Sequence, residues 1–220
     1  MNVTASSSRP AANPRAARSR AALIEAGLRL FAAKPVDAVS VDEIVAAAGV
    51  AKGTFFNHFD DKHAFAASLA AEIRLEIERQ VDEANSGETD PAVRLAGGMR
   101  VAARFALTDR ARTLVMLRAD SGATGAKHPL NAGVSRDLLD AISAGAARPE
   151  AAEWGVLYWI GLCQALMTDI VRRGLSSAEA GSALTAMILM GLSGIGTDPV
   201  SAGKVAEREL RSFQSQDASG

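Results

Sequence analysis

The chain has 220 residues, enough for one large domain or for a small domain joined to a larger one. Aromatic residues make up 5% of it and charged residues of both signs 22%, a composition that favours a soluble, mostly helical protein and excludes fibrous and wholly disordered classes. The formal net charge of -1 gives no overall attraction to nucleic acid, so any contact with DNA has to come from local positive charge.

The start of the chain carries such local charge. Four arginines precede the first acidic residue, Glu25, and they are Arg9, Arg15, Arg18 and Arg20. The segment lacks the apolar core of a secretory signal, so we interpret residues 1–14 as a flexible basic arm. The single cysteine, Cys163, excludes an intramolecular disulfide and favours a cytoplasmic location.

Three helices are predicted to follow in quick succession. Apolar residues at helical spacing indicate a first helix over residues 17–34. Ser40 and Glu43 form a capping box for a second helix, which Gly49 ends. A third, short helix runs over residues 51–58. A helix, a tight glycine turn and a short helix together are typical of a helix-turn-helix, whose second member enters the DNA major groove.

Further helices are expected along the rest of the chain. The fourth is capped by Asp61 and reaches about Ser86, with an apolar stripe along one side. Its charged residues are interpreted as a mostly solvated face: Glu72, Arg74, Glu76, Glu78 and Arg79. The later helices are expected over residues 91–107, 109–120, 130–144, 149–173, 177–192 and 199–213. No strand-like alternation of useful length is present, so the predicted fold class is all-α.

Two of these helices are apolar almost all the way round, namely those containing WGVLYWIGLCQALM and GSALTAMILMGLSGIG. Such helices are normally buried on every side or lie in a membrane. The Gly, Ser and Thr content of the second lowers its hydrophobicity, and the neighbouring helices are amphipathic. We therefore predict a homodimer that shares both helices as a four-helix interface, and no membrane.

The stretch SVDEIVAAAGVAKGTFFNHFDDK resembles the N-terminal helix-turn-helix of the TetR family of bacterial transcription regulators. The resemblance covers roughly the first third of the chain and rests on the capped helix, the AAGV turn, KGT, the aromatic pair, HF and DK in register. It implies a dimeric regulator, usually a repressor, whose larger C-terminal domain binds a small molecule and thereby weakens binding to a palindromic operator. The domains would then be a helix-turn-helix over residues 15–65, an effector-binding and dimerisation domain over 66–213, and a flexible tail over 214–220.

The resemblance also implies which side chains face DNA: Ser40, Lys52, Gly53, Thr54, Phe56, Asn57, His58 and Lys62. Lys52 suits a guanine edge or a phosphate, and Gly53 removes a side chain that would hold the helix away from the groove. Thr54 and Asn57 suit thymine, phosphate or adenine, although a solvated helix face is the alternative for both.

Three of these positions are open to a second interpretation. His58 either donates to a phosphate or supports the helix as a half-buried side chain. Lys62 lies in the first turn of a helix, where positive charge opposes the macrodipole unless a phosphate is bound there. Phe56 departs from the family, which commonly has tyrosine at this position, so either one phosphate contact is lost or the ring packs on a thymine methyl.

The C-terminal half has no comparable motif. Candidates for an effector pocket are large apolar side chains: Met99, Phe105, Met116, Trp154, Tyr158, Trp159, Cys163 and Met167. For any single one of them, an ordinary core position is the alternative. Aromatic and methionine side chains along one helix favour an apolar or aromatic effector over a sugar phosphate.

An enzyme and an architectural DNA-binding protein are the alternative functions. The three histidines have no metal-ligand spacing, and Ser201 with Lys204 matches a nucleophile motif only by letter. No catalytic residue, metal or cofactor is therefore expected. An architectural protein would need little more than the first third of the chain, and loss of DNA binding on adding a ligand would separate it from a regulator.

Overall fold

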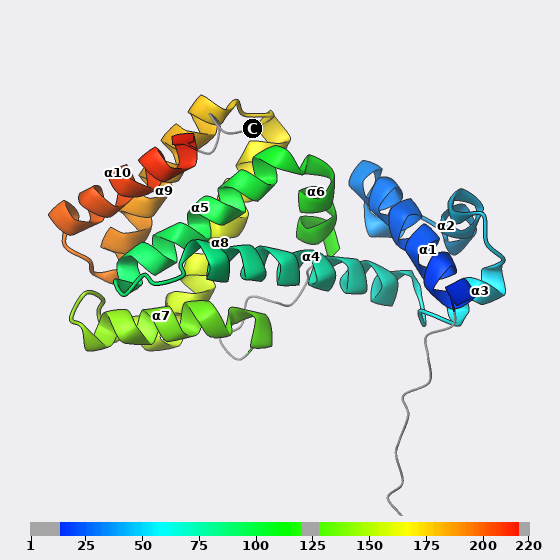
Figure 1. Ribbon diagram of the computed structural model, residues 1–220, viewed down its shortest axis with the longest axis horizontal. Helices are drawn as coiled ribbons and strands as arrows, with labels where there is room; N and C mark the ends of the chain where they lie inside the picture. Colours follow the sequence, from blue (N-terminus) through cyan, green and yellow to red (C-terminus); the bar gives the residue numbers. More distant parts are fainter. Residues whose placement is uncertain (1–13, 120–127, 216–220) are drawn as a thin grey trace, which may run out of the picture. The chain divides into compact units, whose positions relative to one another are not determined.

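The computed structural model describes residues 14–119 and 128–215, and every regular element within these ranges is a helix (Figure 1). The predicted all-α fold is confirmed. The elements are α1 (Pro14–Ala33), η1 (Val36–Ala38), α2 (Val41–Ala48), α3 (Lys52–Phe56), α4 (Lys62–Ala84), α5 (Pro91–Thr108), α6 (Arg110–Ala119), η2 (Pro129–Asn131), α7 (Ala132–Ser143), α8 (Ala151–Arg173), α9 (Ser177–Ile195) and α10 (Pro199–Ser215), where η marks a 3-10 turn. The chain forms two compact units that divide between Ala66 and Ala67, inside α4.

Most of the predicted arm, residues 1–13, lies outside the described residues, as do residues 216–220 of the predicted tail. Helix α1 begins at Pro14, which was assigned to the arm. Proline suits the first turn of a helix, because its φ is already helical and the missing N–H would have no partner there. Three of the four early arginines, at positions 15, 18 and 20, are consequently helical.

The first unit is built around a cluster of four phenylalanine rings, which come from α1, from α3, from the connection after α3 and from the start of α4. Phe55 lies 5.6 Å from Phe65 and 5.7 Å from Phe59 between ring centroids, and Phe65 lies 5.8 Å from Phe31. All four rings are buried. Aromatic pairs at these separations contribute beyond the area they bury, so this cluster fixes how α3 is held.

A glycine makes the tight turn between α2 and α3. Gly49 has a φ of 66°, in the left-handed region, and its N–H donates to the carbonyl of Ala46. The N–H of Val50 donates to the carbonyl of Val45 at 3.1 Å, so the last carbonyls of α2 are satisfied. Only a residue without Cβ adopts this geometry at no steric cost.

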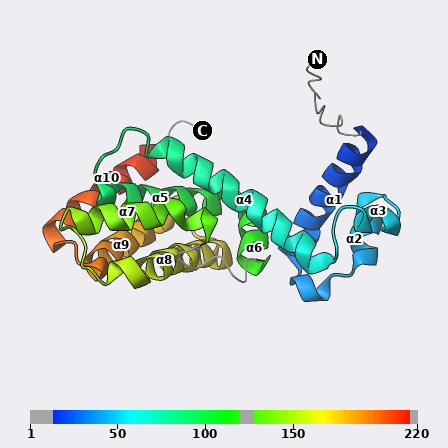
Figure 2. The ribbon, with the colours of Figure 1, turned by 90° about the horizontal axis from the view of Figure 1, so that it is seen from below.

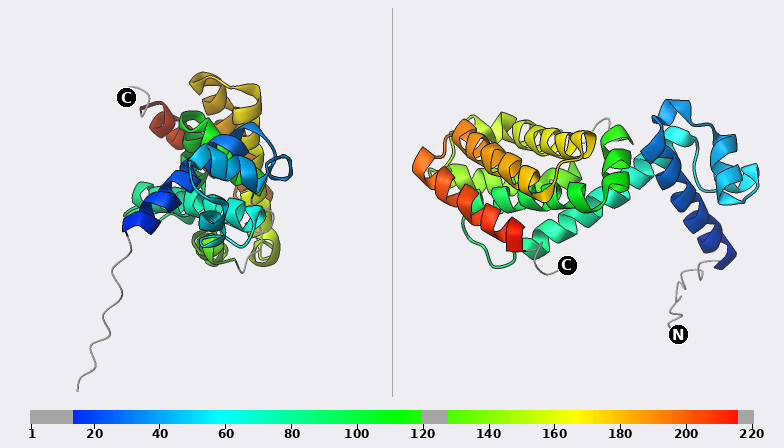
Figure 3. Two further views of the ribbon diagram at one scale, coloured as in Figure 1. Left: turned by 90° about the vertical axis from the view of Figure 1, so that its right-hand side faces the viewer. Right: turned by 90° about the horizontal axis from the view of Figure 1, so that it is seen from above.

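The second unit is organised around α5, which packs against α7, α8, α9 and α10 (Figure 2). Buried residues occur on every side of α5, from Ala92 to Ala106. Helices α9 and α10 lie side by side along their length (Figure 3). Between α5 and α10, the buried guanidinium of Arg100 donates to Glu209 at 2.6 Å. Removing one member of such a pair would leave an uncompensated buried charge.

Helices α8 and α9 are long and apolar enough to cross a membrane by length and composition alone. The core helix of a water-soluble protein meets the same test, and 44% and 39% of these two stretches are buried within the unit. Helix α9 runs to Ile195, three residues beyond the predicted end at Leu192. Gly191 allows α9 to pack closely against α8, because a Cβ there would lie 2.9 Å from the ring of Trp159.

Replacing Gly49 with alanine is expected to destabilise the first unit, because the left-handed conformation costs an L residue about 1–2 kcal/mol. Gly53→Ala is the matched control: its φ is not positive, a Cβ there meets nothing within 4 Å, and the change is expected to raise stability by up to about 1 kcal/mol. Urea unfolding followed by circular dichroism measures both variants. Equal effects of the same sign would contradict this assignment.

The capping box of α2 predicts a pH dependence of stability. The backbone N–H of Ser40 donates to Glu43 at 2.9 Å and Lys34 lies 3.0 Å away, which together lower the pKa of Glu43 from 4.5 to about 2. Since the pKa is lower in the folded state, the stabilisation is present above about pH 4.5 and is lost as the pH falls towards 2.

Glu43→Gln is therefore expected to be less stable than wild type at pH 7, by a difference that disappears between pH 4.5 and 2. Urea midpoints at a series of pH values measure this. Glu25→Gln, which breaks an exposed ion pair with Arg29 on α1, is the control and should have a smaller effect. A Glu43→Gln difference that persisted unchanged at pH 2 would rule out the capping carboxylate as its cause.

Candidate DNA-binding surface and effector cavity

The candidate DNA-binding surface is the outward side of α3 and the residues next to it. The structure brings together on this side the exposed residues Lys52, Gly53, Phe56 and Asn57, with Thr54 half-buried beside them. Phe55 points the opposite way and is fully buried, and its ring supports Phe56 edge-on at 5.4 Å. Phe56 nevertheless leaves 51% of its surface exposed, an unusual position for a large apolar side chain in so small a unit.

Lys52 lies at the first position of α3 and its ammonium group is 2.8 Å from the carboxylate of Asp42 on α2. Both side chains are more than half exposed, so the pair contributes at most about 1 kcal/mol. A stronger anion such as a phosphate can therefore replace Asp42 at small cost.

Gly53 is not required by the packing of the protein itself. Its φ is not positive, and a Cβ at this position would have no neighbour within 4 Å. Glycine nevertheless costs up to about 1 kcal/mol in a helix. A glycine at this position is therefore best explained by a molecule outside the protein that binds against α3 and occupies the space of a side chain.

Two further predicted DNA-facing residues, Ser40 and His58, also have partners within the unit. The hydroxyl of Ser40 accepts the N–H of Glu43 at 3.1 Å as the cap of α2. The Nε2 atom of half-buried His58 lies 3.3 Å from the hydroxyl of Ser19 on α1, which corresponds to its predicted supporting role.

Lys62 is held more firmly. Its ammonium donates to the carbonyls of Asp37 and Val39, at 2.8 and 3.0 Å, and thus ties the start of α4 to the segment before α2. These two carbonyls supply the negative charge that the first turn of α4 lacks, so a phosphate is not needed to explain a lysine there.

The second unit contains a cavity of about 160 Å³ between α4, α5, α6, α7 and α8. Four of the predicted pocket residues line it: Met116, Trp159, Cys163 and Met167. The other four do not. Met99 and Phe105 are buried in the core around α5, and Trp154 and Tyr158 lie on the outer side of α8.

The helical period explains this division on α8. Residues 159, 160, 163, 164 and 167 repeat at intervals of three and four and face the cavity. Trp154 and Tyr158 also lie four residues apart, but they belong to the opposite stripe and leave 61% and 37% of their surface exposed. Membership of one apolar helix was therefore insufficient to assign them to a pocket.

The polar residues that line the cavity are not among the predicted pocket residues. Arg74 and Glu78 on α4 both line it, and Arg74 is only 7% exposed, so the interpretation of these charges as a solvated face is wrong for this residue. Arg74 directly follows Ile73, and Glu78 directly follows Ile77, so the pair runs alongside the apolar stripe. Opposite charges four residues apart beside an apolar stripe are the sequence pattern that indicates such a half-buried pair.

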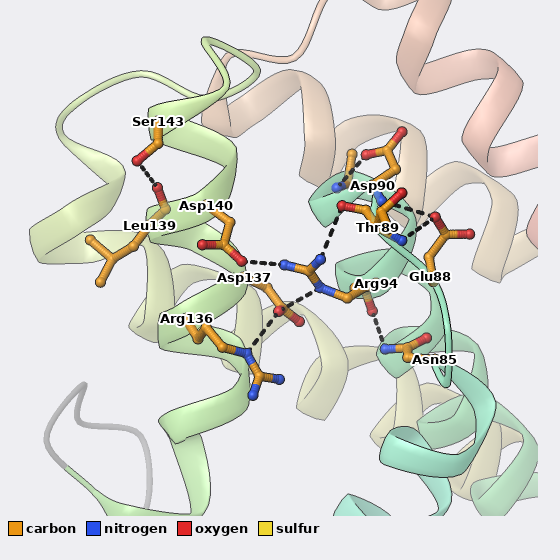
Figure 4. Close-up of polar contacts among 11 residues, drawn as sticks. Asn85, Glu88, Thr89, Asp90, Arg94, Arg136, Asp137, Leu139, Asp140 and Ser143 are labelled. Atoms are coloured by element: carbon orange, nitrogen blue, oxygen red, sulfur yellow. Dashed lines mark hydrogen bonds and ion pairs between the residues drawn. The ribbon is translucent and has the colours of Figure 1, made fainter.

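One end of the cavity is bounded by an ion-pair network between α5 and α7 (Figure 4). Arg94 on α5 donates from Nε to Asp137 at 2.8 Å, from Nη2 to Asp140 at 2.5 Å, and from Nη1 to the carbonyl of Thr89 at 3.1 Å. Its guanidinium is thus engaged on all three nitrogens, while its own carbonyl accepts from Asn85. The network closes this end with charges that are already paired.

Cys163 adds an apolar surface to the cavity. Burial raises the pKa of its thiol to about 12, so the group is neutral at physiological pH and is not an activated nucleophile. Within residues 14–119 and 128–215, no group of three or more His, Cys, Asp or Glu side chains is placed to hold a metal ion.

Comparison with known proteins matches the first unit to a regulatory family. The family model described as "Bacterial regulatory proteins, tetR family" covers residues 23–69. The chain is 33% identical over 72 residues to the HTH-type transcriptional repressor DhaR of Mycobacterium sp. strain GP1, and 36% identical over 88 residues to the transcriptional regulator AcuR of Cereibacter sphaeroides. These matches cover 33% and 40% of this chain, and 36% and 40% of the two relatives.

Solved structures resemble the whole fold. The crystal structure of RolR in complex with resorcinol covers 88% of this chain with a TM-score of 0.61 and 24% identity, and the match takes in 95% of that structure. The fatty acid degradation regulator FadR from Bacillus halodurans covers 86% with a TM-score of 0.63 and 16% identity, across 100% of its own length. Such identities show a shared fold. The helix-turn-helix of this chain, over residues 23–69, is thus similar to that of the TetR family of bacterial transcription regulators.

Proposed function

We propose that the protein is a ligand-responsive repressor that binds a palindromic operator as a homodimer and leaves it when a small apolar or aromatic effector enters the cavity of the second unit. It would work in the cytoplasm and associate with the nucleoid when bound to DNA, with no catalytic role. The observation that carries the proposal is the surface of α3, where a lysine, an open glycine and an exposed phenylalanine lie together.

Gly53 supports this surface as the point of closest approach to DNA. In the major groove, a helix that lacks a side chain at one position can bring its backbone closer to the phosphates and base edges. Lys52 beside it would supply charge, and the flat ring of Phe56 would supply apolar contact of the kind that thymine methyl groups offer. Phe56 has no hydroxyl, so it cannot donate a hydrogen bond to a phosphate.

An exposed apolar face on α8 and α9 supports the homodimer. It consists of Trp154, Leu157, Tyr158, Leu189 and Met190, all at least 37% exposed. The hydroxyl of Tyr158 donates to the carbonyl of Met190 at 3.3 Å, so the residues of the two helices adjoin. A contiguous apolar surface of this kind marks an interaction site, and a two-fold axis would place α8 and α9 of two copies in one four-helix interface.

Helix α4 supports a connection between effector and DNA. Its first residue, Lys62, ties it to the segment before α2, and its later residues Ile77, Glu78 and Val81 line the cavity. An effector that prefers a shifted α4 would weaken DNA binding by the ratio of its affinities for the two arrangements. In the dimer, a small shift is sufficient if it changes the separation of about 34 Å between two successive major grooves.

The alternative of an architectural DNA-binding protein is disfavoured by the same cavity. Such a protein has no use for a partly enclosed space lined by Met116, Trp159 and Met167 beside buried charge. Empty volume inside a core is destabilising, so a cavity of this size is better explained by a ligand than by packing.

Gly53→Ala is expected to weaken operator binding by about tenfold or more while leaving the protein as stable as wild type or slightly more stable. The operator is first obtained by selecting bound fragments from random DNA, and affinity is then measured by fluorescence anisotropy at two salt concentrations, because phosphate contacts make it salt-dependent.

The matched control is Gly203→Ala on α10, another helical glycine whose added Cβ would meet nothing within 4 Å. It should gain similar stability and bind DNA as wild type does. An unchanged operator affinity for Gly53→Ala would mean that α3 does not approach DNA at this residue.

Leu157→Glu is expected to convert the dimer to a monomer, shifting the dissociation constant by about tenfold or more, because a charge would be buried in an apolar interface. Sedimentation velocity over a range of protein concentrations measures this. Leu139→Glu on α7, a leucine of similar exposure outside the face, is the control and should remain dimeric. If both variants stayed dimeric at all concentrations, the interface would have to lie elsewhere.

A further inference from the structure

The charges that line the cavity cancel. Three are basic and three are acidic: Arg74, Arg94, Arg136, Glu78, Asp82 and Asp137. A site for an ionic ligand normally carries an excess of the opposite charge, because a buried ion has to be compensated. The balance here favours a ligand without net charge.

Part of this charge is already used within the protein. Arg94 is engaged on all three nitrogens by Asp137, Asp140 and the carbonyl of Thr89 (Figure 4). The Nε atom of Arg136 lies 3.5 Å from the same Asp137. This end of the cavity therefore has few hydrogen bonds left to offer.

The pair on α4 is different. Arg74 donates from Nε to Glu78 and from Nη2 to Asn131, each at 2.8 Å. Among the described residues, none accepts a hydrogen bond from its Nη1, and none donates to Oε2 of Glu78. A guanidinium has five N–H donors, so this buried group retains donors, and the carboxylate paired with it retains an oxygen that can still accept. One edge of the cavity is thus lined by a residue with unused donors and a residue with an unused acceptor.

The other walls are apolar and set the size. They include Ile77, Leu95, Met116, Trp159, Ile160 and Met167, together with the neutral thiol of Cys163. An apolar cavity of about 150 Å³ is known to hold one benzene molecule, and this cavity measures about 160 Å³. A single aromatic ring therefore fits this volume.

We propose that the ligand of this cavity is a neutral, single-ring compound carrying a hydroxyl group, whose oxygen accepts from Nη1 of Arg74 and whose hydrogen is donated to Oε2 of Glu78. The proposal rests on the effector-binding function proposed above and names the chemical class of the effector. A hydroxyl is the simplest group that both donates and accepts. A carboxylate would be repelled by Glu78, an ammonium by Arg74, and a hydrocarbon would leave both unsatisfied.

The test is calorimetric titration of the full-length protein at pH 7 with four single-ring compounds at millimolar concentrations: phenol, toluene, benzoate and benzylamine. Phenol, neutral at this pH, is expected to bind at least about tenfold more tightly than the other three, as expected for hydrogen bonds to charged groups. Benzoate or benzylamine binding as tightly as phenol would overturn the neutral class. Equal binding of toluene would overturn the role of the hydroxyl, and no binding by any of the four would overturn the whole proposal.

A charge substitution makes the test sharper. Glu78→Gln leaves one basic charge in excess and is expected to raise the affinity for benzoate by about tenfold or more. The control is Asp82→Asn, which makes the same charge change one helical turn further along α4 at an exposed lining residue and should alter benzoate binding little. Equal gains in the two variants would mean that Glu78 does not contact the ligand. The wild-type series decides the question alone if Glu78→Gln fails to fold.

Operator release is measured separately with the same compounds. If phenol binds but the operator complex persists, the ligand class stands and the effector function fails. If the protein binds its operator and no compound binds the cavity, the ligand class fails and the DNA-binding function stands.

Discussion

The burial of Phe55 in the aromatic cluster of the first unit decides what α3 presents to its surroundings. Phe55 contacts Phe59 and Phe65 on its inner side, so the rotation of this five-residue helix about its axis is fixed. With Phe55 inside, Gly53 and Phe56 have to lie outside, because each helical residue is rotated by about 100° from the next; Lys52 is exposed at the first position of the helix. The recognition surface is thus a consequence of core packing.

The same unit separates residues that support α3 from residues that can leave their partners. Lys62 donates to two carbonyls and His58 lies against Ser19, which holds both near the protein. Among the residues that the structure describes, Lys52 pairs with one exposed carboxylate, and such a pair exchanges readily for another anion. A scaffold of firmly held side chains around a few loosely held ones lowers the entropy lost on binding, because only the loose ones have to be ordered.

The core of the second unit contains arginines whose charge is neutralised by carboxylates. Arg100 is neutralised by Glu209 and Arg94 by Asp137 and Asp140, each between different helices, and these pairs hold α5 to α10 and to α7. Arg74 is only partly satisfied, by Glu78 on its own helix and by Asn131. A buried charge with remaining donors is costly, and a ligand that meets them would recover that cost. The incompletely satisfied arginine is therefore the natural anchor for a ligand, whereas the satisfied ones serve the fold.

Short-range sequence patterns were sufficient to predict the helices and the helix-turn-helix. The capping box at Ser40, the glycine at position 49 and the apolar spacing of the later helices depend on neighbours within a few residues, and their predicted positions agree with the structure to within a few residues. The family resemblance likewise rested on a continuous stretch.

Which face of an all-round apolar helix is buried depends on residues far away in the chain. For that reason the sequence alone could not distinguish the exposed Trp154 from the buried Trp159, five residues further along. Arg74 looked solvated for the same reason: only the folding of α4, α5, α7 and α8 around one space enclosed its charge, because burial is a property of the tertiary structure and not of the residue.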